Sequence, residues 1–259
     1  LGYATDFPKD LAPHLPEIAA RGIRIVSNAG GVNPAACAAK LRESIAAAGL
    51  SLRVAVVTGD DLAARAADFA GTAEMFTGAP FPPADKVASV NAYLGAFPIA
   101  EALNHADIVV TGRCADSAVT LALCLHRFGW GPAELDRLAQ GSVAGHLLEC
   151  GPQATGGNFT DWEDAGDIAE IGYPIAEISP DGSFEITKPE GTAGLVTPLS
   201  VGEQMLYEIA DPAAYLLPDV IADFSHVTLT QTAPTRVRVT GARGRSPTET
   251  LKVSVTWAD

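Results

Sequence analysis

In ADIVVTGRCADS, residues 106–117, an apolar run gives way to a polar loop and then to a helix. The β-branched residues Ile108 to Thr111 predict a short buried strand that ends at Gly112. A helix is expected over residues 117–128, because Gly129 supplies a suitable stop. In an open parallel α/β sheet, ligands bind outside the carboxyl ends of the strands, so the residues after this strand are candidates for function.

Three polar residues follow that strand: Arg113, Asp116 and Ser117. An arginine beside a helix N-terminus is suited to holding an anion, because its guanidinium and the unpaired backbone N–H groups act together. In the structural alternative, Asp116 is the N-cap of the helix and Arg113 is its ion-pair partner. A proton-transfer role for Asp116 remains open beside that alternative.

A second strand–loop–helix segment lies near the start of the chain. A strand is expected over residues 22–27, and Asn33 followed by Pro34 predicts a capped helix start. The helix is expected to run to about Ala48 and to end at Gly49, before a strand over residues 52–57. Two strands around one helix predict a βαβ unit, and hence a Rossmann-like, open, mostly parallel sheet in the N-terminal half.

The loop between that first strand and its helix is a candidate anion site. Its candidate residues for binding substrate are Ser27, Asn28, Gly30, Gly31 and Asn33. A glycine turn with a good cap would explain three of them, but not Ser27 and Asn28 at the strand tip. The loop is neither a G-x-G-x-x-G fingerprint nor a phosphate loop with Gly-Lys-Ser/Thr.

Another glycine-rich polar constellation follows residue 144. His146 and Glu149 are three positions apart, so they share a helix face and could form an acid–base pair. The alternative is an ordinary pair of helix residues. Candidate binding residues nearby are Gln153, Thr155, Gly156, Gly157 and Asn158, and Lys188 is a further candidate in a later loop.

The predicted proportion of helices and strands changes near residue 150. We expect an α/β domain over residues 1–150 and an α+β region with antiparallel strands over residues 151–259. Individual expectations are a helix over 62–70, a long loop over 71–90, a helix starting at Pro132, a hairpin over 175–187, a capping box at Ser200–Glu203, strands over 226–230, 236–240 and 251–257, and a hairpin tip at 241–245. The last strand is expected to lack its natural partner.

Composition narrows the function classes. A formal charge of −14 argues against nucleic acid as a partner, because phosphates would be repelled. No apolar run approaches the roughly 20 residues of a membrane helix, and no signal peptide is evident, so a cytoplasmic protein is expected. Four scattered cysteines favour reduced thiols. No metal motif is present; a metal-dependent hydrolase would have to use carboxylates such as Asp60, Asp61 and Asp116.

Several of these motifs together resemble the acyclic terpene utilisation (AtuA) family, over nearly the whole chain and in the same order. The chain resembles an internal portion of that family. The residues that carry the resemblance are Ser27–Pro34, Val110–Ala118, Gly145–Gly151, Thr155–Gly157, Ile186–Pro189, Glu203–Ile209, Asp211–Pro212 and Asp219–Ser225.

The resemblance implies a role in bacterial catabolism of acyclic terpenes such as citronellol and geraniol, which proceeds through branched acyl-CoA thioesters. No catalytic residues are carried over from the family. The expected function is an enzyme of the lyase or hydratase type acting on a branched acyl-CoA or a related carboxylate, in which Asp116, or the pair His146 and Glu149, moves a proton. The alternative is a non-catalytic acyl-CoA-binding or assembly subunit. No cofactor is identified; a homo-oligomer or a carboxylase partner is possible.

Overall fold

The computed structural model describes residues 2–258. The chain folds as two compact units. Unit 1 comprises Leu1–Ala115 and Glu249–Asp259, and unit 2 comprises Asp116–Thr248. Unit 2 is therefore inserted into the sequence of unit 1. The domain boundary expected near residue 150 stays a prediction.

Unit 1 contains the parallel part of this mixed α/β fold. Its elements are α1 (Asp6–Leu11), η1 (Ala12–His14), α2 (Leu15–Arg21), β1 (Ile25–Ser27), α3 (Pro34–Ala47), β2 (Val54–Val57), η2 (Ala63–Phe69), η3 (Ala84–Lys86), β3 (Val87–Ala92), α4 (Ala96–Leu103), β4 (Ile108–Thr111) and β12 (Val253–Trp257).

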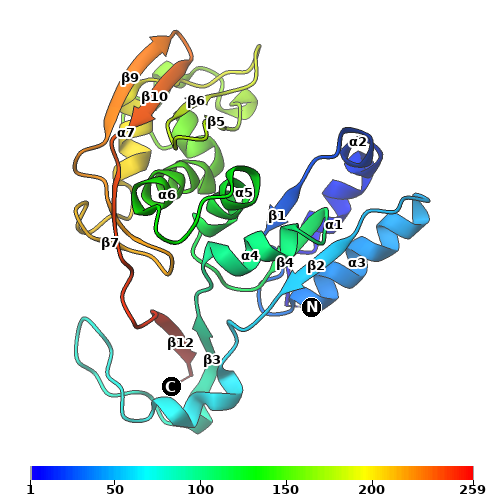
Figure 1. Cartoon of the computed structure of the whole chain (residues 1–259), viewed down its shortest axis with the longest axis vertical. Coiled ribbons are helices and arrows are strands. Elements are labelled where there is room, and N and C mark those ends of the chain that lie inside the picture. Colours follow the sequence, from blue (N-terminus) through cyan, green and yellow to red (C-terminus); the bar gives the residue numbers. More distant parts are fainter. Residues whose placement is uncertain (1, 259) are drawn as a thin grey trace. The chain divides into compact units, whose positions relative to one another are not determined.

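The central sheet of unit 1 has the strand order β1-β4-β2, and all three strands are parallel (Figure 1). Strands β1 and β2, which flank α3 in the sequence, are parallel strands of one sheet. They are not adjacent, because β4 lies between them. All four residues of β4 are buried, as expected for a central strand covered on both faces. The parallel sheet is observed, whereas the more specific Rossmann-like description stays a prediction.

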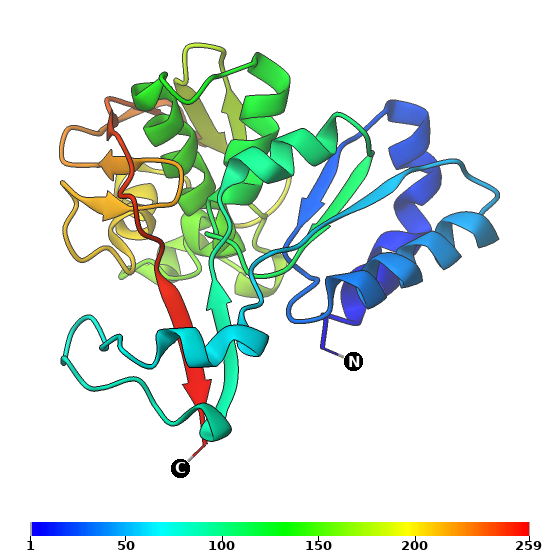
Figure 2. The ribbon, with the colours of Figure 1, turned by 60° about the horizontal axis from the view of Figure 1, so that its bottom comes forward.

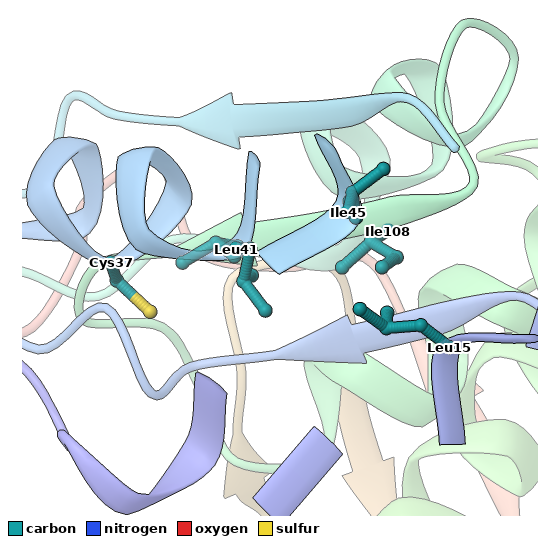
Figure 3. Packing of buried hydrophobic residues seen from close by; sticks show 6 residues of the cluster. Leu15, Cys37, Leu41, Ile45 and Ile108 are labelled. Atoms are coloured by element: carbon teal, nitrogen blue, oxygen red, sulfur yellow. The ribbon is translucent and has the colours of Figure 1, made fainter. Parts of the chain in front are cut away.

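The core on one face of this sheet joins α2, α3 and β4. Leu15, Leu41 and Ile108 are fully buried there, together with Cys37 (Figure 3). The start of α3 follows the sequence signals: Asn33 accepts a hydrogen bond from the Ala36 N–H at 3.2 Å. Gly49 has a φ of 67° beyond the helix end, which confirms the expected left-handed stop.

A two-stranded antiparallel ribbon of β3 and β12 completes unit 1 (Figure 2). The expectation that the strand over 251–257 lacks a partner is wrong, because β12 pairs with β3 from Val87 to Ala92. The helix expected over 62–70 is present as the 3₁₀ helix η2. Part of the loop expected over 71–90 also belongs to strand β3.

Unit 2 is richer in antiparallel strands. Its elements are α5 (Ala118–Phe128), α6 (Leu135–Glu149), η4 (Gly151–Thr155), η5 (Trp162–Ala165), η6 (Ile168–Glu170), β5 (Ile175–Ile178), β6 (Phe184–Thr187), α7 (Pro198–Leu206), β7 (Tyr215–Leu216), β8 (Ile221–Asp223), β9 (Thr228–Ala233), β10 (Arg236–Thr240) and β11 (Arg243–Arg245).

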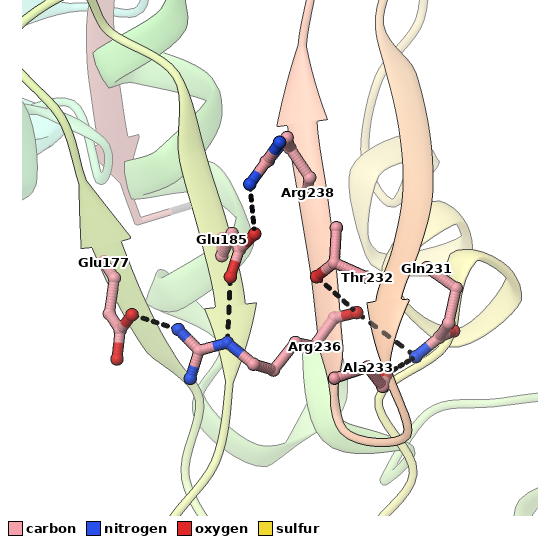
Figure 4. A network of polar contacts seen from close by, with 7 residues as sticks. All are labelled: Glu177, Glu185, Gln231, Thr232, Ala233, Arg236 and Arg238. Atoms are coloured by element: carbon pink, nitrogen blue, oxygen red, sulfur yellow. Dashed lines mark hydrogen bonds and ion pairs between the residues drawn. The ribbon is translucent and has the colours of Figure 1, made fainter.

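The larger sheet of unit 2 has the order β5-β6-β10-β9 and is antiparallel throughout. The expected hairpin around residues 179–182 is confirmed by the pairing of β5 with β6. Charged side chains link three of its strands (Figure 4). Arg236 pairs with Glu177 and Glu185, and Arg238 pairs with Glu185 at 2.9 Å. These opposite charges across neighbouring strands stabilise the register modestly, because such exposed pairs contribute little.

Several local predictions for unit 2 are wrong. The capping box lies at Thr197 and Ser200 instead of Ser200–Glu203, because Pro198 occupies the first helical position. In the segment expected as a hairpin tip at 241–245, the last three residues form strand β11, which pairs with β8. Helix α6 begins at Leu135, after a turn closed by the Glu134 carboxylate on the Gly131 N–H at 2.7 Å.

Across residues 2–258, every helix is too short or too polar to span a bilayer.

Candidate functional site

Two helices in unit 2 approach each other closely at the start of α5. Gly145 on α6 faces Ser117, and a methyl group at position 145 would lie 2.6 Å from both the Cα and the carbonyl oxygen of Ser117. Only glycine fits this contact without a shift of the backbone. Because Ser117 occupies the N-cap position of α5, the alternative of Asp116 as that cap is wrong. The close approach places Asp116 beside the last turn of α6.

Asp116, His146 and Glu149 come together at that point. The Glu149 carboxyl lies 3.7 Å from Nδ1 of His146, and the Asp116 carboxyl lies close enough to raise the pKa of Glu149. Their helical spacing of three brings His146 and Glu149 to one face of α6, as the sequence predicts. Asp116 joins them from the start of α5, a contact that the sequence alone does not define.

The proton affinity of Glu149 is unusual for a carboxyl group. Its side chain is only 17% exposed although it ends the helix. Burial raises the pKa of Glu149 to about 7, and the neighbouring carboxyls of Asp116 and Glu208 add to the rise. Both effects disfavour a further negative charge at this place. Glu149 can therefore give or accept a proton near neutral pH, which is what general acid–base catalysis requires.

His146 is almost completely enclosed, with 2% of its surface exposed. Burial lowers the pKa of His146, although carbonyl groups of Met205 and Gln204 oppose that effect. The ring packs against Tyr215 and Phe224, with centroids 5.8 and 5.9 Å away. A neutral imidazole is therefore favoured at pH 7, so its contact with Glu149 is not a fixed ion pair.

The junction of α6, η4 and α7 contains unsatisfied buried polar atoms. Within residues 2–258, these are Nε2 of His146, Oε1 of Gln153 and Oε1 of Gln204. Gln204 is 1% exposed, and its Nε2 donates to the carbonyl oxygen of His146 at 3.2 Å. Buried polar atoms without partners are uncommon and costly, so they point to a place where a ligand could complete the hydrogen bonding.

Glu208 is a residue that sequence reasoning missed. It follows the end of α7 and has a φ of 60°, the one positive value among the described residues other than glycine. Such a backbone costs about 1–3 kcal/mol and is typical of functional positions. Its carboxyl raises the pKa values of Glu149 and of Tyr207. No local pattern singles out Glu208 as a site residue, although Gln204 and Glu208 both lie in the Glu203–Ile209 segment that the family resemblance includes.

Unit 1 has a separate polar edge at the carboxyl ends of its parallel strands. The buried Asp60 carboxylate follows β2 and accepts the backbone N–H of Arg113 at 2.9 Å and Nδ2 of Asn91 at 3.1 Å. Gly112 passes so close to this carboxylate that a Cβ atom would lie 2.5 Å from it. Asp60 thus fixes the backbone that carries Arg113.

The Arg113 side chain is exposed at this edge. Its guanidinium donates to the Tyr93 hydroxyl at 2.8 Å and lies 5.2 Å from the centre of the tyrosine ring. These contacts orient the guanidinium while its position at the surface allows an anion to approach.

The loop after β1 lies at the same edge, but many of its backbone groups form hydrogen bonds within the loop. The Ser27 hydroxyl accepts the Ala29 N–H at 3.1 Å, and the Gly31 N–H donates to the Asn28 carbonyl at 3.1 Å. The Asn33 N–H donates to the Gly30 carbonyl, and Gly30 packs against the end of β4. The loop geometry thus uses several of the donors that an anion would need, and Asn28 remains an exposed side chain at the strand tip.

The other candidate binding residues lie elsewhere in unit 2. Thr155 is buried and donates to the Gly172 carbonyl at 2.6 Å, which is a structural contact. Lys188 donates to the Thr192 carbonyl at 2.6 Å and closes its own loop. Gly156 has a φ of 108° in the turn that follows η4, and Gly157 and Asn158 are exposed there. Of this set, Gln153 alone places an unsatisfied atom at the α6–η4–α7 junction.

Among the described residues, no three histidine, cysteine, aspartate or glutamate side chains are grouped so that they could hold a metal ion.

Comparison with known proteins gives a family match. No curated protein and no solved structure matches this chain. The family described as acyclic terpene utilisation family protein AtuA matches residues 1–259. Because that match covers the chain from end to end, the protein belongs to the acyclic terpene utilisation family AtuA.

Proposed function

We propose that this protein is an enzyme of acyclic terpene utilisation that transfers protons on a branched acyl-CoA thioester or a related carboxylate. This proposal rests on the Glu149 carboxyl, which lies beside Asp116 and has a pKa of about 7. Two adjacent carboxyls can supply an acid and a base at the same place. Family membership supports a role in acyclic terpene utilisation.

A dehydration illustrates the chemistry that this pair can perform. The carboxylate takes a proton from C2 of a 3-hydroxyacyl thioester, while the protonated carboxyl gives its proton to the leaving hydroxyl. The C2–H and C3–O bonds break, a C2=C3 double bond forms and water leaves. The reverse sequence is a hydration. Neutral His146 lies beside Glu149, with Nδ1 3.7 Å from the carboxyl.

Arg113 is proposed to bind an anionic group at the sheet edge of unit 1. Its orientation by Asp60 and Tyr93 supports this role. Replacing Arg113 with Ala is expected to raise the dissociation constant of a bound thioester about tenfold, the effect of losing one charge-assisted hydrogen bond at an exposed site. Isothermal titration calorimetry measures this change. Arg65→Ala is the matched control, since Arg65 is an exposed arginine paired with Asp68; equal losses in both variants would contradict the assignment.

The function is tested by proton exchange. The protein is screened by thermal shift against branched acyl-CoA thioesters, free branched acids and divalent metal ions. Each thioester that binds is then incubated in D₂O, and deuterium at C2 is measured by NMR. Enzyme-dependent exchange is expected for at least one thioester. Binding without exchange or turnover would overturn the catalytic proposal in favour of a binding subunit, and a shift with metal alone would favour a hydrolase.

A further inference from the structure

The charged side chains that raise the pKa of Glu149 most strongly are acidic. The charged side chains with the largest effects on the pKa values of Glu149, Tyr215 and Cys150 are Asp116, Glu149 and Glu208. All three are acidic, so an anionic group that entered this cluster would be repelled from several sides. The anionic part of any substrate must therefore be bound away from these carboxyls.

The junction of α6, η4 and α7 contains hydrogen-bond acceptors that lack a partner among residues 2–258. Gln204 is 99% enclosed, and its Oε1 atom is unsatisfied, as is Oε1 of Gln153. Since Nε2 of Gln204 donates to the His146 carbonyl, the amide is held with its oxygen directed elsewhere. An amide oxygen cannot donate, so the group that satisfies it must carry an O–H or N–H donor.

We propose that the part of the substrate that reaches Asp116, Glu149 and Glu208 is an uncharged carbon chain bearing a hydroxyl group, which donates a hydrogen bond to Oε1 of Gln204. This inference rests on the proposed function and adds to it the substrate class. The enzyme selects 3-hydroxyacyl thioesters over their deoxy analogues and rejects a carboxylate at the same position. Access is from the surface, where Asp116 and Glu208 are exposed.

Three matched coenzyme A thioesters test the selection. They are 3-hydroxy-3-methylbutanoyl-CoA, its isostere 3,3-dimethylbutanoyl-CoA and the anionic 3-carboxy-3-methylbutanoyl-CoA. The coenzyme is common to all three, so its own charges cancel in the comparison. At pH 7, calorimetry is expected to show about tenfold tighter binding of the hydroxy compound than of the isostere, and the weakest binding for the carboxy compound. Equal affinities, or tightest binding of the carboxy compound, would overturn the proposal.

Two variants assign these preferences to residues. Gln204→Met removes the acceptor at similar length, so the hydroxy compound should bind only as tightly as the isostere. Glu208→Gln removes one negative charge from an exposed residue and should improve binding of the carboxy compound about tenfold, with little change for the isostere. If Gln204→Met fails to fold, Glu208→Gln still decides the charge argument, because an unchanged rank order in that variant contradicts it.

The outcomes also separate this proposal from the proposed function. Selective binding of the hydroxy compound without deuterium exchange or turnover would remove the enzyme assignment and leave the binding preference standing. Exchange at C2 with equal affinity for all three thioesters would overturn the binding preference and leave the enzyme assignment standing.

Discussion

Replacing Glu149 with Gln is expected to lower turnover by about 10²- to 10⁴-fold and, at the same time, to make the protein more stable above neutral pH. The first effect follows from loss of the group that moves the proton. The second follows from removal of a carboxylate that burial and two neighbouring carboxyls make unfavourable. A residue that is retained at a cost in stability is typical of a functional site.

The sign of the pH effect follows from the two pKa values. Glu149 has a pKa of about 7 in the folded protein and the ordinary value of 4.5 when exposed. Between these values the folded state binds more protons, so stability falls as pH rises from about 4.5 to about 7 and then levels off. Glu149→Gln removes this slope and should be more stable than the wild type at pH 8 by about 2 kcal/mol, allowing for partial screening by solvent.

Urea unfolding of both proteins at pH 5, 6, 7 and 8 measures this difference, and their subtraction removes the effects of all other titrating groups. Glu17→Gln is the control, because Glu17 is an exposed helix residue paired with Arg21. Parallel profiles for the wild type and Glu149→Gln would show that the carboxyl at 149 titrates normally.

The second large effect is expected from Gly145→Ala. Alanine favours a helix over glycine by about 1 kcal/mol, so the substitution would stabilise an isolated helix. At position 145 its methyl group would lie 2.6 Å from two backbone atoms of Ser117, which cannot move as a side-chain tip can. Steric overlap of this kind costs about 1–3 kcal/mol or more and should outweigh the helix preference. We expect a net loss of about 2 kcal/mol.

The same substitution should also weaken the contact between Asp116 and Glu149, since it separates the start of α5 from α6. The pH slope of stability should therefore become smaller in Gly145→Ala. Gly71→Ala is a matched control, because nothing lies within 4 Å of a Cβ atom at position 71 and its backbone is not left-handed. Equal stability of the two variants would exclude the tight helix contact.

The sequence predicted those features that depend on neighbouring residues. The cap at Asn33, the stop at Gly49 and the hairpin before β6 are each determined by the local chain, and the structure reproduces them. The spacing of His146 and Glu149 likewise determines that they share a helix face. Local patterns carry this information because helices and turns are satisfied within a few residues.

Features that depend on packing were not accessible in this way. The position of β4 between β1 and β2 depends on which strands meet in space. The raised pKa of Glu149 comes first from burial and then from Asp116 and Glu208, which lie far away in the sequence. Glu208 adopts its left-handed backbone without the glycine or asparagine that would predict it. Sequence reasoning therefore named Asp116, His146 and Glu149 as candidates, but not Glu208 or the burial that raises the pKa of Glu149.

The insertion of unit 2 into unit 1 has a consequence for synthesis on the ribosome. Ser89 of β3 and Thr256 of β12 are hydrogen-bonded across 167 positions of sequence. Strand β3 therefore emerges long before the strand that covers its edge, and the whole of unit 2 is made in the interval. Contacts of such high sequence separation form slowly, and an uncovered strand edge favours aggregation. A nascent chain stalled before residue 249 would carry this open edge, which makes it a natural substrate for chaperones.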